Sequence, residues 1–304
     1  MRAVWSFWSK PFKSCKGRIW REPCHHLLAW GLSLRLARQH FAETQLVTDT
    51  AGKRLLVDAL GLKFDLVSTE LDRLHDAAPG WWALGKLTAY SLQDRPFVHI
   101  DTDVFLWKAL PSRLTCAPVF AQCSESHSLE NEWCGPRHIE YLFDRHQLKL
   151  PVEWQWASSR NTTWFREDNC GILGGNNVDF IRHYAQTALR LVCDPAHRAL
   201  WDELPDKSGF TMLIEQFFLA CCIDYHRIAP ESNYRGVNIR YLFPSSSEAY
   251  NPLTAANLGY THLQGDNKTH PHVMERLERR VAQLDPVFLR HCNRIAKRNV
   301  ALGV

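Results

Sequence analysis

Phe97-Val-His-Ile-Asp-Thr-Asp-Val-Phe-Leu106 is the stretch of sequence that decides the fold. Its apolar residues are β-branched, aromatic or aliphatic, and neither Gly nor Pro interrupts it, so the pattern predicts a strand over 97–106. A run this apolar is typical of a strand that is buried on both faces of a parallel sheet. The stretch nevertheless contains two carboxylates, Asp101 and Asp103.

Asp101 and Asp103 are two residues apart, and side chains at that spacing on a strand point the same way. Two unpaired buried carboxylates would cost on the order of several kcal/mol each, and they would repel each other. A divalent cation would neutralise the pair and accept oxygen ligands. We therefore predict a metal site at Asp101-Thr102-Asp103, at the carboxyl end of a core strand, where ligands bind in open α/β sheets. The alternative is an Asp-Thr-Asp turn that caps a helix.

The composition is that of an ordinary globular protein. The 304 residues are 45% hydrophobic and 22% charged, which allows a sizeable core in one large domain or two small ones. The net charge of +4 is too small to indicate nucleic acid as a partner. No apolar run is long enough to span a bilayer, and the residues after Trp8 are too polar for a secretory signal peptide. We therefore expect a cytoplasmic protein.

The ten cysteines are scattered along the chain without a CxxC pair, so neither a zinc ribbon nor a redox motif is expected. Cys24-His25-His26 is a local group of metal-ligand residue types, but no second ligand pair stands at a familiar spacing from it. We interpret the cysteines as buried, reduced thiols of a cytosolic protein.

Strands and helices alternate along the first hundred residues. We predict strands at 3–8, 45–48 and 64–68, and helices at 22–41, 53–60 and 81–92. The last of these helices leads into the strand that contains Asp101. This alternation predicts an α/β domain with a largely parallel sheet.

The pattern is less regular after Asp103. We predict further strands near 118–121, at 170–176, from 228 and at 260–263, and helices at 178–192, 210–220 and 272–300. Residues 124–165 lack clear periodicity, and we interpret them as a lid or an acceptor-side insertion. The simplest division is one globular domain over 1–270 and a basic helical extension over 271–304.

Three further segments have residue types that suit a ligand site beside a metal. His262-Leu-Gln-Gly265-Asp-Asn-Lys268 combines a metal ligand, a glycine that lets the backbone approach a diphosphate, and a cation. Asn169 and Gly171 begin a Gly-rich segment whose amides suit sugar hydroxyls. Glu215-Gln216 stands in an apolar helix and needs partners or a cleft. Taken singly, the three could be an exposed loop, a Gly-rich turn and the solvent face of a helix.

In this order, the segments resemble the metal-dependent nucleotide-sugar glycosyltransferases of GT-A fold. The resemblance is to the retaining group that includes glycogenin and the bacterial lipopolysaccharide galactosyltransferases, and it spans roughly residues 81–268. The opening, Trp5-Ser-Phe-Trp-Ser-Lys-Pro-Phe12, is also similar to a bacterial family catalogued only as a domain of unknown function. The resemblance implies an α/β fold with a Rossmann-like mixed sheet flanked by helices, followed by the C-terminal helical extension.

The resemblance also implies a role for each matched residue. Mn²⁺ or Mg²⁺ would be held by Asp101, Asp103 and His262. A UDP-sugar donor would be contacted by Asp101, Thr102, Asp103, Asn169, Gly171, Gly265 and Lys268. The catalytic residues would be Lys86, Glu215 and Gln216. The implied reaction transfers a hexose to a glycan or lipid-linked acceptor, with retention of the anomeric configuration.

Other classes of protein share parts of this pattern. A GT-A-shaped protein that binds nucleotide or glycan without turnover would have the same sequence features. A phosphatase of the haloacid dehalogenase type also ends a strand in DxD, but it needs a small Thr or Val where Phe105 stands. A zinc-binding interaction module is not indicated, because paired Cys motifs are absent.

The segment 274–298 is rich in arginine and lysine. We interpret these residues as the solvated face of a helix. The alternative is peripheral contact with an anionic membrane surface, at the inner face of the membrane.

Overall fold

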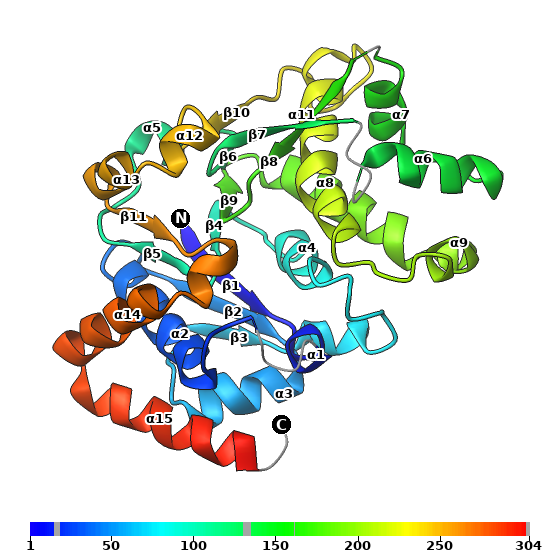
Figure 1. Ribbon diagram of the computed structural model, residues 1–304. Coiled ribbons are helices and arrows are strands. Elements are labelled where there is room, and N and C mark those ends of the chain that lie inside the picture. Colours follow the sequence, from blue (N-terminus) through cyan, green and yellow to red (C-terminus); the bar gives the residue numbers. More distant parts are fainter. Residues whose placement is uncertain (15–18, 130–134, 161, 302–304) are drawn as a thin grey trace.

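The computed structural model describes residues 1–14, 19–129, 135–160 and 162–301. At its centre is a seven-stranded mixed sheet with helices on both faces (Figure 1). The strand order is β10-β6-β9-β4-β1-β2-β3. The predicted α/β class, with a Rossmann-like mixed sheet flanked by helices, is confirmed.

Most strands of the central sheet are parallel, and β9 is the exception. It runs antiparallel between β4 and β6, whereas β4, β1, β2 and β3 pair in parallel, as do β6 and β10. The strands of this sheet are β1 (Arg2–Phe7), β2 (Thr44–Thr48), β3 (Leu66–Ser68), β4 (Phe97–Ile100), β6 (Val119–Ala121), β9 (Ile172–Gly175) and β10 (Ile239–Tyr241). Two smaller antiparallel sheets pair β5 (Val104–Leu106) with β11 (Tyr260–His262) and β7 (Ser124–Ser128) with β8 (Trp164–Asp168).

The alternation of side chains along β1 builds a separate core on each face of the sheet. Trp5 and Phe7 pack on the side of α2 (Pro23–Ala37), whereas Val4 packs on the side of α4 (Leu84–Ser91). Successive side chains of a strand point to opposite faces, so a strand in the middle of the sheet supplies both cores. The indole of Trp5 also donates a hydrogen bond to Ser33 Oγ of α2, at 3.1 Å.

The C-terminal helices α14 (Pro271–Leu284) and α15 (Pro286–Ala301) lie beside α2 in Figure 1. Gly31 of α2 permits this packing, because a Cβ there would come within 2.1 Å of the Phe288 ring. The arginines of α14 and α15 whose side chains are described are exposed, so membrane contact stays a prediction that sedimentation with anionic liposomes would test. Within the described part of the chain, no helix has both the length and the apolar character that crossing a bilayer requires.

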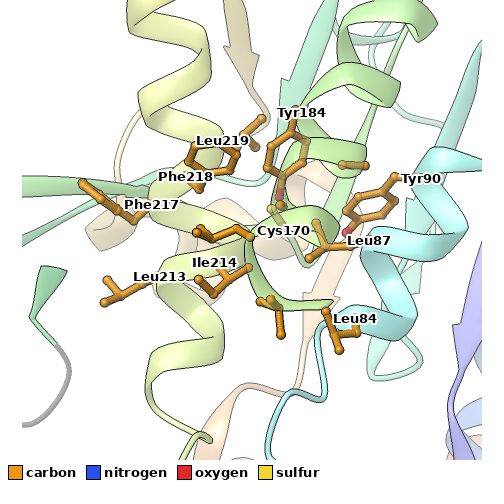
Figure 2. Packing of buried hydrophobic residues seen from close by; sticks show 14 of the residues in the cluster. Leu84, Leu87, Tyr90, Cys170, Tyr184, Leu213, Ile214, Phe217, Phe218 and Leu219 are labelled. Carbon is orange, nitrogen blue, oxygen red and sulfur yellow. The ribbon is translucent and has the colours of Figure 1, made fainter. Parts of the chain in front are cut away.

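The opposite face of the sheet is covered by α4, α8 (Val178–Cys193) and α11 (Phe218–Ile228). Figure 2 shows buried side chains of α4 and α8 meeting those of residues 213–219, with Cys170 among them. The remaining helices are α1 (Ser9–Ser14), α3 (Thr50–Lys53), η1 (Arg54–Ala59), η2 (Glu70–Leu74), α5 (Ser112–Thr115), α6 (Pro136–Arg145), α7 (Val152–Ser158), η3 (Pro195–His197), α9 (Arg198–Asp202), α10 (Phe210–Met212), η4 (Leu213–Phe217), α12 (Ser246–Ala249), α13 (Pro252–Leu258) and η5 (Gly265–Lys268).

The prediction of one continuous strand over 97–106 is wrong. β4 ends at Ile100 and β5 begins at Val104, and the residues between them form a turn in which Val104 N–H donates to Asp101 O at 2.9 Å. The chain leaves the central sheet here because β5 pairs with β11, which places His262 opposite Val104. Asp101 and Asp103 therefore project from a turn rather than from a strand.

The helix predicted over 210–220 is longer than expected and contains a local widening. The π-helical segment η4 contains Glu215 and Gln216, and α11 continues to Ile228. The strand predicted to begin at Ile228 is therefore wrong. Buried residues such as Cys222 and Ile223 continue the helical face, and this packing outweighs the strand propensity of a single isoleucine.

The region 124–165 contains regular elements that its sequence did not reveal, namely β7, α6 and α7. Residues 130–134 and 161 lie outside the described part, and a role of this region as a lid or acceptor-side insertion stays a prediction. Every cysteine that the structure describes is a free thiol. The expectation that the cysteines are buried is wrong for Cys116 and Cys193, which are exposed, and for Cys24, which is half-buried. Cys15 and Cys134 lie outside the described residues.

Candidate active site

A cavity of about 520 Å³ lies at the carboxyl ends of β1 and β4. Each predicted site residue except Glu215 lines it: Lys86, Asp101, Thr102, Asp103, Asn169, Gly171, Gln216, His262, Gly265 and Lys268. These residues come from α4, the turn after β4, the turn before β9, η4, β11 and η5. The fold thus brings together segments that are distant in the sequence.

Lys86 joins two acidic side chains at the inner wall of the cavity. Its Nζ lies 3.0 Å from Asp101 Oδ1 and 2.8 Å from Glu215 Oε1, and it donates to Cys170 O at 3.1 Å. The Glu215 side chain is fully buried, whereas that of Asp101 is 24% exposed. Lys86 therefore stands between Glu215 and the cavity.

The charges of this group depend on one another. Burial alone would lower the pKa of Lys86, but the neighbouring Asp101 and Glu215 outweigh burial and raise it. Burial raises the pKa of Glu215, and Asp101 adds to that rise, while Lys86 opposes it. The ammonium is the group that makes two buried carboxylates tolerable.

Two tyrosines fix Glu215. Tyr90 OH donates to Glu215 Oε1 at 3.0 Å, and Tyr184 OH donates to the Glu215 main-chain oxygen at 2.6 Å. Figure 2 shows both tyrosines entering the same cluster from α4 and α8. Among the described residues, Glu215 Oε2 has no hydrogen-bond partner. The structure thus places Glu215 behind Lys86, so a contact between Glu215 and a sugar stays a prediction.

Asp103 is also paired with a lysine. Its Oδ2 lies 2.5 Å from Lys268 Nζ, and its Oδ1 lies 3.5 Å from His262 Nε2. Burial opposes ionisation of Asp103, but the pKa of Asp103 lies far below its usual range, mainly because the Lys268 ammonium lies beside it. The supposition that the two aspartates are unpaired is therefore wrong, because a lysine from a distant segment reaches each of them.

The donor set nevertheless fits a divalent cation. Asp101, Asp103 and His262 each offer a ligand atom, and the three atoms lie within 4.8 Å of one another. His262 Nδ1 lies 2.7 Å from Gln122 Oε1, and an amide oxygen only accepts, so Nδ1 has the proton. In the neutral imidazole, the lone pair of Nε2 then faces a carboxylate, which favours a cation between them.

Asn169 and Gln216 differ in how their amides are used. Asn169 Oδ1 accepts from Gly171 N–H at 3.0 Å, and its Nδ2 donates to Glu125 Oε1 at 3.0 Å. Asn169 therefore shapes the turn before β9. Gln216 lines the cavity, and its buried Oε1 has no partner among the described residues. Gln216 is thus the amide with an acceptor left for a ligand.

The sequence did not identify several residues of the site. Gln122 accepts from Tyr260 OH at 2.6 Å and orients His262. Its position directly after β6 is the pattern that could have identified it, since polar residues at the carboxyl ends of strands face the ligand crevice. Aromatic residues of the N-terminal segment, Trp8, Phe12 and Trp20, also line the cavity.

We predict that Gly171→Ala weakens metal binding. A Cβ at this position would lie 2.5 Å from both Gln122 Oε1 and His262 Nδ1, so it would displace the histidine or its orienting partner. Disturbing such a partner costs about tenfold to hundredfold in metal affinity. Titration with Mn²⁺ followed by electron paramagnetic resonance measures the change; an unchanged affinity would mean that His262 is not a ligand.

Residues 1–295 match the model of a family of unknown function, DUF6734. The chain belongs to this family. A search of curated proteins finds no match to the DUF6734 chain.

Among solved structures, one similar to the DUF6734 chain is the galactosyltransferase LgtC in complex with donor and acceptor sugar analogs. The two chains are 11% identical, the match covers 92% of this chain and 94% of that chain, and the TM-score is 0.41. At this identity and this TM-score, the likeness assigns no function.

Proposed function

We propose that the protein is a metal-dependent glycosyltransferase. It would transfer a hexose from a nucleotide-sugar, a UDP-sugar, to a glycan or lipid-linked acceptor. The observation that supports this most is the convergence of Asp101, Asp103 and His262 with two lysines, Lys86 and Lys268, in one cavity. Three ligands for a hard cation beside two ammonium groups suit a diphosphate better than they suit a neutral substrate.

Asp101, Asp103 and His262 would hold Mn²⁺ or Mg²⁺, which when bound offsets charge that develops on the leaving diphosphate. Lys268 would exchange its contact with Asp103 for a phosphate oxygen, since its side chain is 21% exposed and can move toward the ligand. Gly265, at φ 53° with open space where a Cβ would stand, leaves room for the diphosphate beside the backbone.

The other walls of the cavity would hold the base and the sugar. Trp8, Phe12 and Trp20 line the N-terminal wall, and a nucleobase that stacks on an aromatic ring gains about 1–3 kcal/mol. Gln216 would accept a hydrogen bond from a sugar hydroxyl, because its Oε1 lacks a partner among the described residues. Lys86, held by Glu215, would present its charge to the sugar or the diphosphate. Retention of configuration at the anomeric carbon is part of the proposal.

A thermal-shift panel of nucleotides and nucleotide-sugars, with and without Mn²⁺, tests the proposal. We expect UDP to raise the melting temperature only with Mn²⁺, and the true donor to raise it further. A ligand at a hundredfold excess over its Kd adds about 2.7 kcal/mol to the free energy of unfolding. A shift with another nucleotide alone would change the donor class, and no shift with any nucleotide would contradict the proposal.

The second candidate is a GT-A-shaped protein that binds nucleotide or glycan without turnover. One observation favours this second candidate. The ion pairs of Lys86 with Asp101 and of Lys268 with Asp103 neutralise both acids without a metal. Affinity for UDP together with neither sugar transfer nor donor hydrolysis would support this candidate over the enzyme.

A further inference from the structure

A second group of metal-ligand side chains lies among the helices of the upper part of Figure 1. Glu153 of α7, His183 of α8 and His226 of α11 each offer one ligand atom, and these atoms lie within 4.8 Å of one another. The side chains of Glu153 and His226 are 4% and 7% exposed, and that of His183 is 28% exposed. The three residues lie far apart in the sequence, so no motif with a characteristic spacing identifies them as a metal site.

The three ligand atoms form a nearly equilateral triangle. Glu153 Oε1 lies 2.8 Å from His183 Nε2 and 3.1 Å from His226 Nε2, and the two nitrogens lie 3.1 Å apart. No arrangement of protons on the two imidazoles turns all three of these contacts into hydrogen bonds. If both nitrogens donate to the carboxylate, two N–H groups face each other; if only one donates, a nitrogen lone pair faces another acceptor.

A cation resolves this conflict, because all three atoms can then act as ligands. A point about 1 Å above the triangle lies about 2.0–2.1 Å from each atom, which matches zinc bonded to imidazole nitrogen and carboxylate oxygen. Three protein ligands of the His₂Glu type leave a fourth position for water.

The surroundings supply what zinc ligands require. His226 Nδ1 lies 2.6 Å from Ser232 Oγ. Such a contact on the far ring nitrogen fixes the orientation of a ligating imidazole.

A third group of metal-ligand side chains, between α2 and α14, differs from this one. Cys24, His25 and Glu278 also lie within ligand distance of one another. There the Glu22 N–H donates to His25 Nδ1 at 3.1 Å, so Nε2 has the proton and donates to Glu278 at 2.8 Å. Both nitrogens of His25 thus have hydrogen-bond partners without a metal, so this cluster has no conflict for a zinc ion to resolve.

We propose that Glu153, His183 and His226 bind one zinc ion, which fastens α7 to α8 and α11. This site is separate from the cavity of the proposed transferase and does not depend on it. α7 also contributes Trp156 to a second cavity, of about 530 Å³, which is lined on the α11 side by Asp224 and Arg227. Zinc would thus hold one wall of that cavity in place.

The test measures zinc bound per chain in a variant that lacks Asp103, one of the three proposed metal ligands in the cavity of the proposed transferase. Asp103→Ala, stripped with a chelator and dialysed against ZnCl₂, is expected to retain one zinc by mass spectrometry of the metal. Adding His183→Ala is expected to remove it, whereas adding His146→Ala is expected to leave it. His146 is the matched control, since it also pairs with a glutamate, at 2.6 Å from Glu203. No zinc in Asp103→Ala, or zinc retained with His183→Ala, would overturn the proposal.

A measurement on the unsubstituted chain covers the case in which His183→Ala does not fold. The side chains of His183 and His146 are 28% and 24% exposed, so diethyl pyrocarbonate is expected to label both in the metal-free protein. Zinc is expected to protect His183 at least tenfold and His146 not at all. Equal labelling of His183 with and without zinc would refute the site.

Discussion

Lys86→Met is expected to lower the free energy of unfolding by about 3–5 kcal/mol, because removing one partner of a buried ion pair leaves an uncompensated charge. Here two carboxylates lose their partner: Asp101, at 3.0 Å, and the fully buried Glu215, at 2.8 Å. Urea unfolding followed by tryptophan fluorescence measures the loss. Activity is expected to disappear as well, since the same ammonium faces the cavity.

The loss of stability in Lys86→Met should depend on pH. Without the lysine, burial raises the pKa of Glu215 in the folded state above its unfolded value. A carboxyl with a raised folded pKa costs stability as pH rises from its unfolded pKa to its folded pKa. The deficit relative to the unsubstituted protein should therefore be smaller at about pH 5 than at about pH 8.

Two further variants make the Lys86 prediction specific. Glu215→Gln in the Lys86→Met background is expected to restore part of the stability, because the amide needs no counter-charge. Lys108→Met is the control. Lys108 is exposed, and among the described residues its ammonium donates to the Asn257 main-chain oxygen, so losing that group should change stability by about 0.5 kcal/mol or less. An equal effect of Lys86→Met and Lys108→Met would show that the buried pair is not formed.

Asp103→Ala is expected to abolish metal-dependent binding of the UDP-sugar and to reduce kcat/KM by about a thousandfold or more. A metal that offsets charge on the leaving group contributes several kcal/mol to the transition state, and about 4 kcal/mol corresponds to a factor of a thousand. The fold should survive, because the partner left behind, Lys268, is 21% exposed and can turn to solvent. Isothermal titration calorimetry with manganese measures the binding.

Asp266→Ala is the matched control for Asp103→Ala. Asp266 lies on the same loop as Lys268, in η5, but it is exposed and does not line the cavity. Its removal changes the net charge by the same amount and should leave binding unchanged. If Asp103→Ala still binds the UDP-sugar with manganese as the unsubstituted protein does, the assignment of the metal site is wrong.

Local pattern was enough to predict most of the elements. The alternation of β1 and the helical spacing of α2 and α8 are properties of neighbouring residues, and the predicted elements agree with the structure to within a few residues. The same holds for residue chemistry at the site. Asp101, Asp103, His262 and Lys268 are residue types that suit a metal and a diphosphate, and all of them line one cavity.

Sequence patterns failed where long-range pairing or packing opposed the local propensity of a segment. The run 97–106 has the propensity of one strand, but pairing of β5 with β11 breaks it at Asp101. Ile228 suggested a strand, but packing of α11 extended the helix to that residue. In both cases a partner distant in the sequence decided the backbone, and propensity is a property of the segment alone.

By itself, the sequence determined the class of fold, the order of most strands and helices along the chain, and the residue types available for chemistry, because these depend on side chains a few positions apart. Only the tertiary structure decided which charges meet. The pairing of Lys86 with Glu215, of Lys268 with Asp103, and the triangle of Glu153, His183 and His226 each join separate elements. Ion pairs and metal sites act over a few ångströms, and only the folded chain brings such atoms that close.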